Sequence, residues 1–576
     1  MIKFLIGVGT GVLLVFLSMF LLFFALLRFR ERPPDIAANS VLVLRLAGTL
    51  PEKAPVEIPF LSEGPSLTVS SVWTALRQAA ADSRIRAVVL EPEGLRAGWA
   101  KLEELRQDIA QFRKSGKPVY AYLHTPSARE YYVATAADRI YIGPADQVYL
   151  KGLRAEVMFF KKTLDKLGVA IEVAHAGKYK DYGDQFTRSD MSPETREVIT
   201  SLVDGIYGNL LAGIAAGRKK TPEQVSAIID QGLFLAPELE KAGLVDELRF
   251  EDQMWSELKS RLGLTDGKPG DLKRVKAETY ARVPDTAGLA RKSRVALVVG
   301  EGDIVRGSPD SLASDGDSLT SIAFDKLLEQ VGNDSSIRAV VVRIDSPGGE
   351  VRASDDIWRS MNLLSKKKPV VISMSDVAAS GGYYMAMTGD PIVAYATTQT
   401  GSIGVVFGKP NLHGLYDKLG ITKDFVQRGK YADIDSDYIS LNSDQRQKLQ
   451  HGIDENYEDF VAKVAAARHR PASDIDPVAQ GRVWLGSQAK ERGLVDAIGG
   501  LDTAIEMAKK KANIPAAENV TVVSYPARRS LFDLLLRRSQ EDVLESRLRA
   551  VFRGMPFHAW MEGGFLRMTP YWISFQ

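Results

Sequence analysis

Hydrophobic residues form one long run at the start of the chain and short runs thereafter. Residues 4–27 are 24 positions without a charge, which as a helix would be about 36 Å long against roughly 30 Å of membrane hydrocarbon. Further along, β-branched runs such as 340–344 and 369–374 flank a helical stretch, 353–364. Strands that alternate with helices in this way predict parallel α/β layers.

The first apolar run predicts an uncleaved, single-pass membrane anchor within residues 1–32. A cleavable signal peptide has a shorter apolar region and a small-residue cleavage site, whereas this run is followed by Arg28, Arg30 and Arg32. By the positive-inside rule these arginines would place the body of the protein in the cytoplasm. Charge alone therefore conflicts with a body on the outer side of the membrane.

The sequence contains two copies of one unit. Residues 85–89 (IRAVV) recur as residues 337–341, and the offset is 338 − 86 = 252. Residues 131–132, 165–168 and 177–179 recur at the same offset. A repeat of this length predicts two domains of one fold, so the predicted fold class is α/β with two tandem units behind a transmembrane helix.

The repeat divides the chain into five predicted parts. They are the anchor (1–32), the first unit (33–264), a linker rich in Gly, Pro and charge (265–292), the second unit (293–516) and a C-terminal extension (517–576). Apolar residues of the extension, such as Leu531, Leu535 and Leu544, are spaced as in an amphipathic helix on a membrane. Its aromatic tail, which includes Trp560 and Trp572, favours packing over membrane contact.

Composition narrows the chemistry. The net charge of +2 argues against a nucleic-acid partner. The absence of cysteine excludes disulfides, thiolate metal sites and cysteine nucleophiles. The six histidines lie in no glycine-rich context that would indicate a catalytic triad: His124, His175, His413, His451, His469 and His558.

The two copies differ where chemistry would be needed. The second unit has DSPGG at 345–349 and AASGGYY at 378–384, whereas the first has EGLRA at 93–97 and Ala128 at the position of Ser380. Paired glycines let backbone N–H groups approach a ligand. A serine in a strand-to-helix turn can act as a nucleophile beside such groups. A small residue packed in a tight turn is the alternative interpretation.

The third difference has the opposite sense. Lys180 of the first unit corresponds in the repeat to Ala432 of the second. A lysine can act as a general base when burial lowers its pKa from about 10.4, and Ser-Lys dyads are a known variant of the nucleophile-base pair. Catalysis would then require a lysine from one unit and a serine from the other. A solvated charge is the alternative for Lys180, and Lys178 is the alternative base, although it recurs as Lys430.

These motifs resemble the signal peptide peptidase A family in its long, duplicated bacterial form, a relative of the Clp protease proteolytic subunit and the crotonases. The resemblance covers nearly all of residues 40–515 and rests jointly on DSPGG, AASGGY, TGSIG (400–404) and GKYK (177–180). It implies that Ser380 is the nucleophile, Lys180 the general base and acid, and Ser402 the serine that orients the lysine. Gly349 and Gly381 would supply the oxyanion-hole N–H groups.

The resemblance also implies a biological setting. Family members cut released signal peptides and other unfolded chains, need neither cofactor nor metal, and form homo-oligomers, here expected to be a tetramer. Their catalytic body lies on the periplasmic or extracellular side of the cytoplasmic membrane, which is the predicted location here.

Two other functions compete with the peptidase. Crotonase-type acyl-CoA chemistry shares the layered fold and an oxyanion hole, although the anchor and the serine before Gly381 and Gly382 argue against it. A non-enzymatic membrane scaffold would be favoured had both dyad partners been lost, but each survives once.

Overall fold

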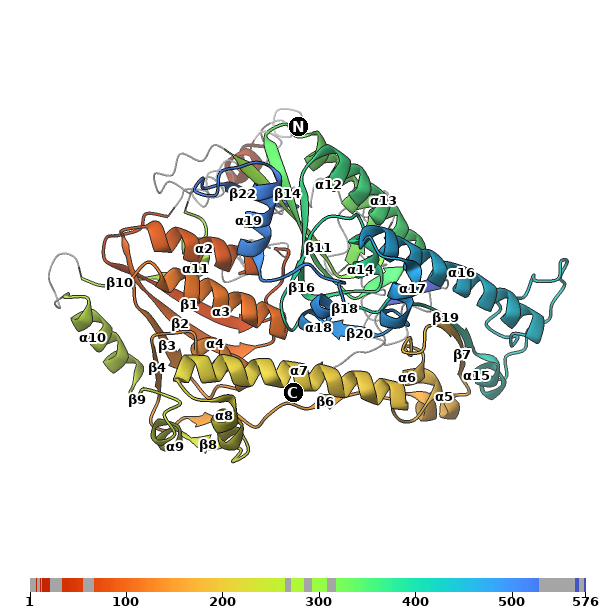
Figure 1. Cartoon of the computed structure of the whole chain (residues 1–576), viewed down its shortest axis with the longest axis horizontal. Helices are drawn as coiled ribbons and strands as arrows, with labels where there is room; N and C mark the ends of the chain where they lie inside the picture. The colour runs from red at the N-terminus through yellow and green to blue at the C-terminus, as the bar shows by residue number, and fades with distance from the viewer. Residues whose placement is uncertain are drawn as a thin grey trace.

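The folded body consists of two α/β units, drawn mainly in red to yellow and in green to blue in Figure 1. The computed structural model describes residues 7, 11, 13–20, 34–54, 67–264, 271–283, 293–307, 318–527, 565–568 and 574–575. Strands alternate with helices in both units, so the prediction of an α/β chain with two repeated units is confirmed.

Each unit is built on a parallel sheet with the same strand order. In the first unit the order is β10 (Lys273–Lys276), β1 (Ser40–Gly48), β2 (Ile85–Leu95), β3 (Val119–Leu123), β4 (Arg139–Ile142), β9 (Glu247–Leu248). In the second it is β22 (Thr521–Tyr525), β11 (Arg294–Glu301), β14 (Ile337–Ser346), β16 (Val370–Ala379), β17 (Ile392–Ala394), β21 (Ala497–Ile498). Farther along its length, β16 also pairs with β18 (Gln399–Gly401), which pairs with β20 (Val483–Leu485). The two copies of the repeated sequence therefore fold into sheets with the same strand order.

Helices cover both faces of each sheet. The first unit contains α2 (Val69–Ala81), α3 (Trp99–Arg113), α4 (Ala128–Ala134), α5 (Lys161–Leu167), α6 (Asp184–Thr187), α7 (Pro193–Arg218), α8 (Pro222–Ile229), α9 (Ala236–Lys241), α10 (Glu251–Arg261) and α11 (Ala277–Tyr280). Along β1, Leu42 and Leu44 pack into the larger core with α2, α3 and α7, while Val41 and Val43 pack against α10. A strand buried on both faces reads as a continuous apolar run, which explains the short runs in the sequence.

The second unit repeats this layering. Its helices are α12 (Ser321–Asn333), α13 (Val351–Lys367), α14 (Gly381–Met385), α15 (His413–Leu419), α16 (Ser443–Ala467), α17 (Ala472–Ile475), α18 (Gly486–Glu491) and α19 (Leu501–Lys511). Helix α19 covers one face of the sheet, and Trp73 from α2 of the first unit packs into the same cluster. The indole Nε1 of Trp73 donates to Asp502 Oδ1 at 2.8 Å, so the two units contact each other directly.

A third, mixed sheet contains strands from both units. Its order is β13 (Ser318–Thr320), β12 (Asp303–Val305), β15 (Gly348–Glu350), β23 (Phe565–Met568), β19 (Val405–Asn411), β7 (Ala170–Ala176). The short pairs are β5 (Gln147–Val148) with β8 (Phe234–Leu235) and β6 (Ala155–Glu156) with β24 (Ser574–Phe575). Since β7 belongs to the first unit and β19 to the second, this sheet joins the two units by backbone hydrogen bonds.

The structure differs from the predicted boundaries in two places. The interval assigned to a linker, 265–292, contains β10, which pairs with β1, and α11. The interval assigned to the C-terminal extension contains β22, which pairs with β11 in the same way. Sequence periodicity missed both because each strand is short and lies at a sheet edge. The predicted amphipathic helix and most of the aromatic tail lie outside the described residues.

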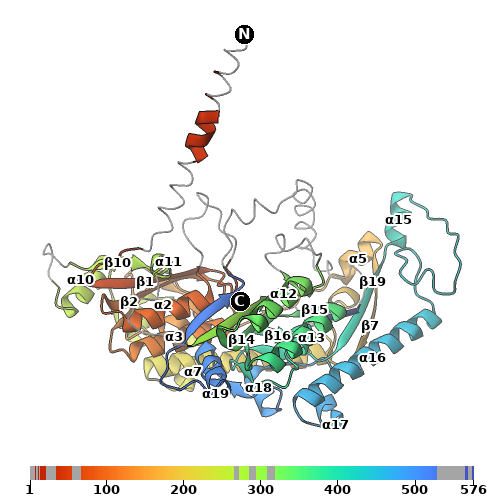
Figure 2. The ribbon, with the colours of Figure 1, turned by 90° about the horizontal axis from the view of Figure 1, so that it is seen from above.

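The predicted anchor is described only in part. Residues 13–20 are helical and stand away from the body in Figure 2, and their large apolar side chains are 51–68% exposed. Among the described residues, one helix, α7, is long and apolar enough to cross a membrane. However, α7 buries Val198, Leu202, Ile206, Leu210 and Ile214 in the first core, as a helix of the folded body does.

Candidate active site

A strand ladder between the units brings Lys180 to the second unit. Strands β7 and β19 pair antiparallel from Ala170 opposite Asn411 to Ala176 opposite Val405. The chain leaves β7 at Ala176 four residues before Lys180, and it enters β19 at Val405 three residues after Ser402. Because the two ends lie side by side, residues distant in sequence share one site.

The Lys180 side chain is fully buried and makes three close polar contacts. Its Nζ lies 2.8 Å from Ser380 Oγ, 3.0 Å from the carbonyl oxygen of Ser402 and 3.0 Å from Ser402 Oγ. Backbone bonds from Tyr179 N to Gln480 O (2.7 Å) and from Gly481 N to Ile403 O (2.7 Å) fix the surrounding loops. The sequence-predicted lysine and serines therefore meet, although Lys180 and Ser380 are 200 residues apart.

Ser380 occupies a backbone conformation that is rare for a residue with a side chain. It follows β16 and precedes α14 with φ 54° and ψ −115°, and such strain costs about 1–3 kcal/mol. Its N–H donates to Gly401 O at 2.8 Å, which ties the turn to β18. The predicted strand-to-helix turn is present, and it directs the Ser380 hydroxyl at Lys180.

Gly349 and Gly381 lie next to each other beside this serine. A Cβ on Gly381 would lie 3.2 Å from Gly349 N and 2.5 Å from Ser354 Oγ. A Cβ on Gly349, which has φ +159°, would lie 2.0 Å from Ile304 O. A side chain at position 349 would collide with backbone, one at position 381 would displace the Ser354 hydroxyl, and the backbones of the two glycines approach each other closely.

Ser402 is held by its own backbone. It has φ 50° and donates its N–H to Arg482 O at 2.8 Å. The side chain is fully buried, so its Oγ reaches the Lys180 amine in a site without solvent contact.

The corresponding place in the first unit is filled. Ala128 stands at the position of Ser380, and Glu130 stands at the position of Gly382. The Glu130 carboxylate accepts a hydrogen bond from Leu95 N at 2.5 Å and another from Ser127 N at 2.9 Å. A carboxylate at the position of Gly382 thus takes up two backbone donors of this turn, and no serine stands at the position of Ser380 in the first unit.

The alternative base, Lys178, lies outside the site. Its side chain is 57% exposed and its Nζ is 3.8 Å from Glu194. Its counterpart Lys430 is also exposed and pairs with Asp444 at 2.7 Å. His175, on β7, is exposed, and its Nδ1 lies 3.1 Å from Gly177 O.

Sequence reasoning missed two glycines that position Lys180. A Cβ on Gly404 would lie 3.0 Å from Lys180 Cδ, and one on Gly481 would lie 2.6 Å from Lys180 Cβ. Gly481 has a counterpart, Gly232, in the first unit. The comparison of copies therefore carried no signal for it.

Strand β23 near the C-terminus lies between two strands of the site. It pairs antiparallel with β15, where Arg567 is opposite Gly349, and with β19, where Leu566 is opposite Val406. An extended backbone thus runs along the strand that carries Gly349. No sequence pattern predicted this pairing.

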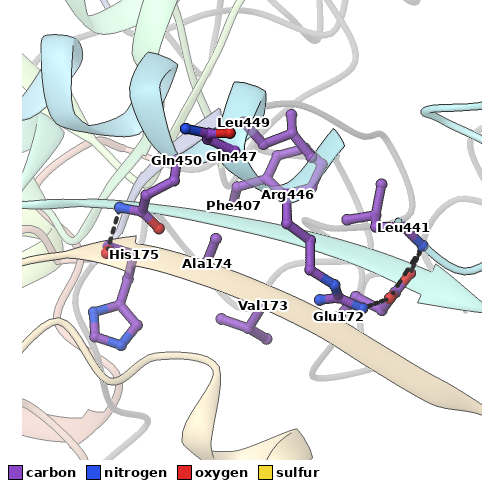
Figure 3. A pocket seen from close by; sticks show the side chains of 10 residues that line it. All are labelled: Glu172, Val173, Ala174, His175, Phe407, Leu441, Arg446, Gln447, Leu449 and Gln450. Carbon is purple, nitrogen blue, oxygen red and sulfur yellow. Dashed lines mark hydrogen bonds and ion pairs between the residues drawn. The ribbon is translucent and has the colours of Figure 1, made fainter. Parts of the chain in front are cut away.

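A separate hollow of about 420 Å³ opens on the same ladder. Figure 3 shows its lining from β7, β19 and α16, with Arg446 and Leu441 N both directed at Glu172 and Gln450 bonded to His175 O. Neither Lys180 nor Ser380 lines it, so it is not the site of the serine and lysine. Within the described residues no group of three His, Asp or Glu side chains could hold a metal ion.

Comparison with known proteins identifies the family. Peptidase family S49 matches twice, over residues 111–265 and 362–515. The chain is 37% identical over 491 residues to "Serine protease SPPA, chloroplastic" of Arabidopsis thaliana (85% of this chain, 71% of the relative). It is 33% identical over 456 residues to "Protease 4" of Salmonella typhi (77% and 72%) and 30% identical over 525 residues to "Protease 4" of Haemophilus influenzae (87% and 84%). The chain therefore belongs to peptidase family S49 and is a serine protease.

Proposed function

We propose that this chain is a membrane-anchored endopeptidase that uses Ser380 and Lys180 as a catalytic dyad and degrades released signal peptides and other unfolded chains through an acyl-enzyme. The observation that carries the proposal is the 2.8 Å distance between Lys180 Nζ and Ser380 Oγ, both fully buried. Membership in a peptidase family, with both dyad partners present, favours this function over acyl-CoA chemistry and over a scaffold.

The contacts of the lysine suit a neutral amine. A neutral amine has two N–H donors and one lone pair, and Ser402 offers two acceptors at 3.0 Å, its carbonyl oxygen and its Oγ. With both N–H groups donated to Ser402, the lone pair faces the Ser380 hydroxyl. Removal from water disfavours the charged ammonium, so burial helps to keep the lone pair available. Ser402 would thereby orient the base.

Acylation follows from this arrangement. Ser380 Oγ attacks the carbonyl carbon of the scissile peptide bond while Lys180 Nζ takes the hydroxyl proton. The carbonyl oxygen becomes an oxyanion, which the N–H groups of Gly349 and Gly381 would stabilise. Lys180 then gives its proton to the leaving amine as the C–N bond breaks. The products of this step are the amine fragment and an ester on Ser380.

Deacylation uses the same groups. Water attacks the ester carbonyl while Lys180 takes the water proton, and the proton passes to Ser380 Oγ as the ester bond breaks. The acid fragment leaves and the neutral lysine is restored. Apart from the substrate and this water, both half-reactions use the same groups of the chain.

An extended peptide is the substrate that the site geometry favours. Strand β23 lies antiparallel along β15, with Arg567 opposite Gly349, so this strand edge accepts an extended backbone. A peptide that pairs with β15 would place a carbonyl beside Gly349, as β-strand addition does elsewhere. A folded chain could not present its backbone in this way, which supports unfolded substrates.

The proposal extends to location and assembly. The exposed apolar residues 13–20 support an anchor, and likeness to the family supports a body on the periplasmic or extracellular side and a tetramer. A reporter fused after Gln576 tests the side, and light scattering of the detergent-solubilised chain tests the assembly. The likeness of each unit to the Clp and crotonase folds stays a prediction.

Covalent labelling tests the dyad. The full chain should react with a peptidyl fluorophosphonate and cleave an unfolded peptide, and Ser380→Ala and Lys180→Ala should each abolish both. Lys178→Ala is the matched control and should retain both, since Lys178 is exposed. Undiminished cleavage in Ser380→Ala or Lys180→Ala would reject the proposal.

A further inference from the structure

A buried ion cluster joins the first unit to the two strands that lead into the site. The cluster consists of Lys101, Glu301, Asp345 and Asp376. Lys101 Nζ lies 2.7 Å from Asp345 Oδ2, 3.8 Å from Glu301 Oε1 and 3.9 Å from Asp376 Oδ2. Lys101, on α3 of the first unit, is 6% exposed. Its three carboxylate partners all belong to the second unit.

The two aspartates lie at an irregularity in the second sheet. Ile344 pairs with Met374 and Ser346 pairs with Ala378, so one residue of β14, Asp345, faces three residues of β16, 375–377. The Asp345 Oδ1 accepts a hydrogen bond from Val377 N at 3.0 Å. Bulges of this kind redirect a strand and are frequent next to active sites.

Beyond the bulge, both strands enter the site. Strand β16 pairs with β17 through Ile372 and Ser373 before the bulge and with β18 from Val377 onwards. It ends at Ala379, directly before Ser380, which is four residues after Asp376, while the chain that leaves β14 at Ser346 reaches Gly349 of β15, four residues after Asp345. The course of the chain at the bulge therefore sets the distance between nucleophile and anion hole.

Asp376 also caps α3 of the first unit. Its Oδ2 accepts from Gly98 N and its Oδ1 accepts from Lys101 N, both at 3.0 Å. A Cβ on Gly98 would lie 2.3–2.5 Å from the Asp376 carboxyl group, so the close approach requires glycine. The bulge is thus fixed to the opposing unit by backbone as well as by Lys101.

We propose that Lys101 is a positioning residue for the reaction, which holds the Asp345–Asp376 bulge so that Ser380 and Gly349 keep their catalytic separation. The proposal rests on the proposed dyad and deepens it, because the first unit then supplies both the base and the charge that orders the nucleophile strand. Lys101 touches neither substrate nor Ser380 in this role.

Charge explains why a lysine is needed. Three neighbouring carboxylates whose side chains are only 12–22% exposed repel each other unless a cation lies among them. Burial opposes the charge of Lys101, but Asp345 and Asp376 hold its pKa above the ordinary value. Burial raises the pKa of Asp376 to about 6 against the effect of Lys101. Without the cation, the carboxylates would separate or take up protons, and either change would disturb the bulge.

The two copies differ here as they do at the dyad. Helices α3 and α13 begin 252 residues apart, at Trp99 and Val351, and Lys101 corresponds to Ala353. The second unit therefore has no lysine that could hold the corresponding strands of the first, which carry no nucleophile. If Lys101 served folding alone, its presence in one copy would not be expected to match the copy whose partner strand carries Ser380.

Steady-state kinetics of Lys101→Met in the full chain test the role. We expect kcat for an unfolded peptide to fall on the order of 10²-fold, as for a small misplacement of reacting groups, with KM nearly unchanged and fluorophosphonate labelling slowed in parallel. Lys509→Met is the matched control, because Lys509 is a 4% exposed lysine paired with Glu506 on its own helix. Its kcat should equal that of the unchanged chain.

A second variant separates positioning from folding. Lys101→Met combined with Asp345→Asn removes the nearest of the three carboxylates left without the cation and keeps an oxygen for Val377 N, and it should recover part of kcat. The inference is overturned if Lys101→Met keeps the kcat of the unchanged chain, or if the double variant recovers thermal stability without kcat. Persistent cleavage by Ser380→Ala in the same assay would instead reject the proposed dyad itself.

Discussion

Gly481 has no space for a side chain because Lys180 lies where its Cβ would be. A Cβ on Gly481 would lie 2.6 Å from both the backbone N and the Cβ of Lys180. The counterpart in the first unit, Gly232, also has a positive φ, +90° against +75°, but nothing lies within 4 Å of its Cβ position. Both glycines adopt a positive φ that favours glycine, and only at Gly481 is there also no room for a Cβ.

Gly481→Ala should therefore move Lys180 and reduce catalysis. Displacement of the amine from Ser380 should lower kcat on the order of 10²-fold, while the αL backbone costs about 1–2 kcal/mol of stability. Peptide cleavage and thermal unfolding measure the two effects.

Gly232→Ala is the control for the backbone cost. It should lower stability by a similar amount and leave kcat per folded molecule unchanged. Equal kcat losses in both variants would show that Gly481 acts on folding and not through Lys180.

Much of the fold could be predicted because local patterns encode it. The run 340–344 lies within β14, the run 369–374 overlaps β16 from residue 370, and the helical stretch 353–364 lies within α13. The cross-unit ladder of β7 and β19 could not be predicted, because pairing partners far apart in sequence leave no periodicity. The short edge strands β10 and β22 were missed for lack of length.

The candidate site could be predicted where the two copies differ. Ser380 against Ala128 and Lys180 against Ala432 marked residues that the structure brings to 2.8 Å, while their catalytic roles stay predictions. Lys101 was missed because a lysine in a charged stretch reads as a solvated face. Lys101 is buried against carboxylates of the second unit, such as Asp345, which its own stretch of sequence does not reveal.

Ser402→Ala should slow the chemical step and leave binding unchanged. The variant keeps the carbonyl contact to Lys180 Nζ and loses the Oγ contact at 3.0 Å. One hydrogen bond is worth about 1 kcal/mol, so kcat should fall by about 5- to 10-fold with KM constant. A loss as large as that of Lys180→Ala would mean that Ser402 does more than orient the amine.

Stability should decrease as pH rises through the range set by Glu103. This 7% exposed residue of α3 accepts hydrogen bonds from Thr397 N (3.0 Å) and from the Thr397 hydroxyl, and burial raises its pKa to about 7, with Thr397 and Arg106 acting in the opposite direction. In the unfolded chain the pKa of a glutamate is about 4.3. Between pH values of about 4.3 and about 7 the native state binds more protons than the unfolded state. The free energy of unfolding therefore falls by up to about 1.4 kcal/mol for each unit by which the pH rises.

Glu103→Gln isolates this contribution. Urea unfolding of both chains between about pH 5 and about pH 7 should give a smaller decrease for the variant, because a glutamine cannot titrate. Other buried carboxyl groups with a raised pKa, such as Asp376 and Glu104, contribute equally to both chains and cancel in the difference. Parallel pH profiles would mean that Glu103 keeps one protonation state throughout this range.

Deletion of residues 564–576 should improve the binding of peptide substrates. Strand β23 occupies the edges of both β15 and β19, with Met568, Arg567 and Leu566 opposite residues 348–350. A substrate that extends along β15 must pair with the same edge, so β23 and the substrate compete for it.

The deletion should lower KM for an unfolded peptide several-fold while kcat stays constant. A synthetic peptide of residues 562–571 should inhibit the shortened chain competitively. Deletion of 572–576 alone removes β24 but keeps β23, and it should leave KM unchanged. A higher KM in the longer deletion would instead make β23 a wall of the binding groove, because loss of the strand would then remove contacts that the substrate uses.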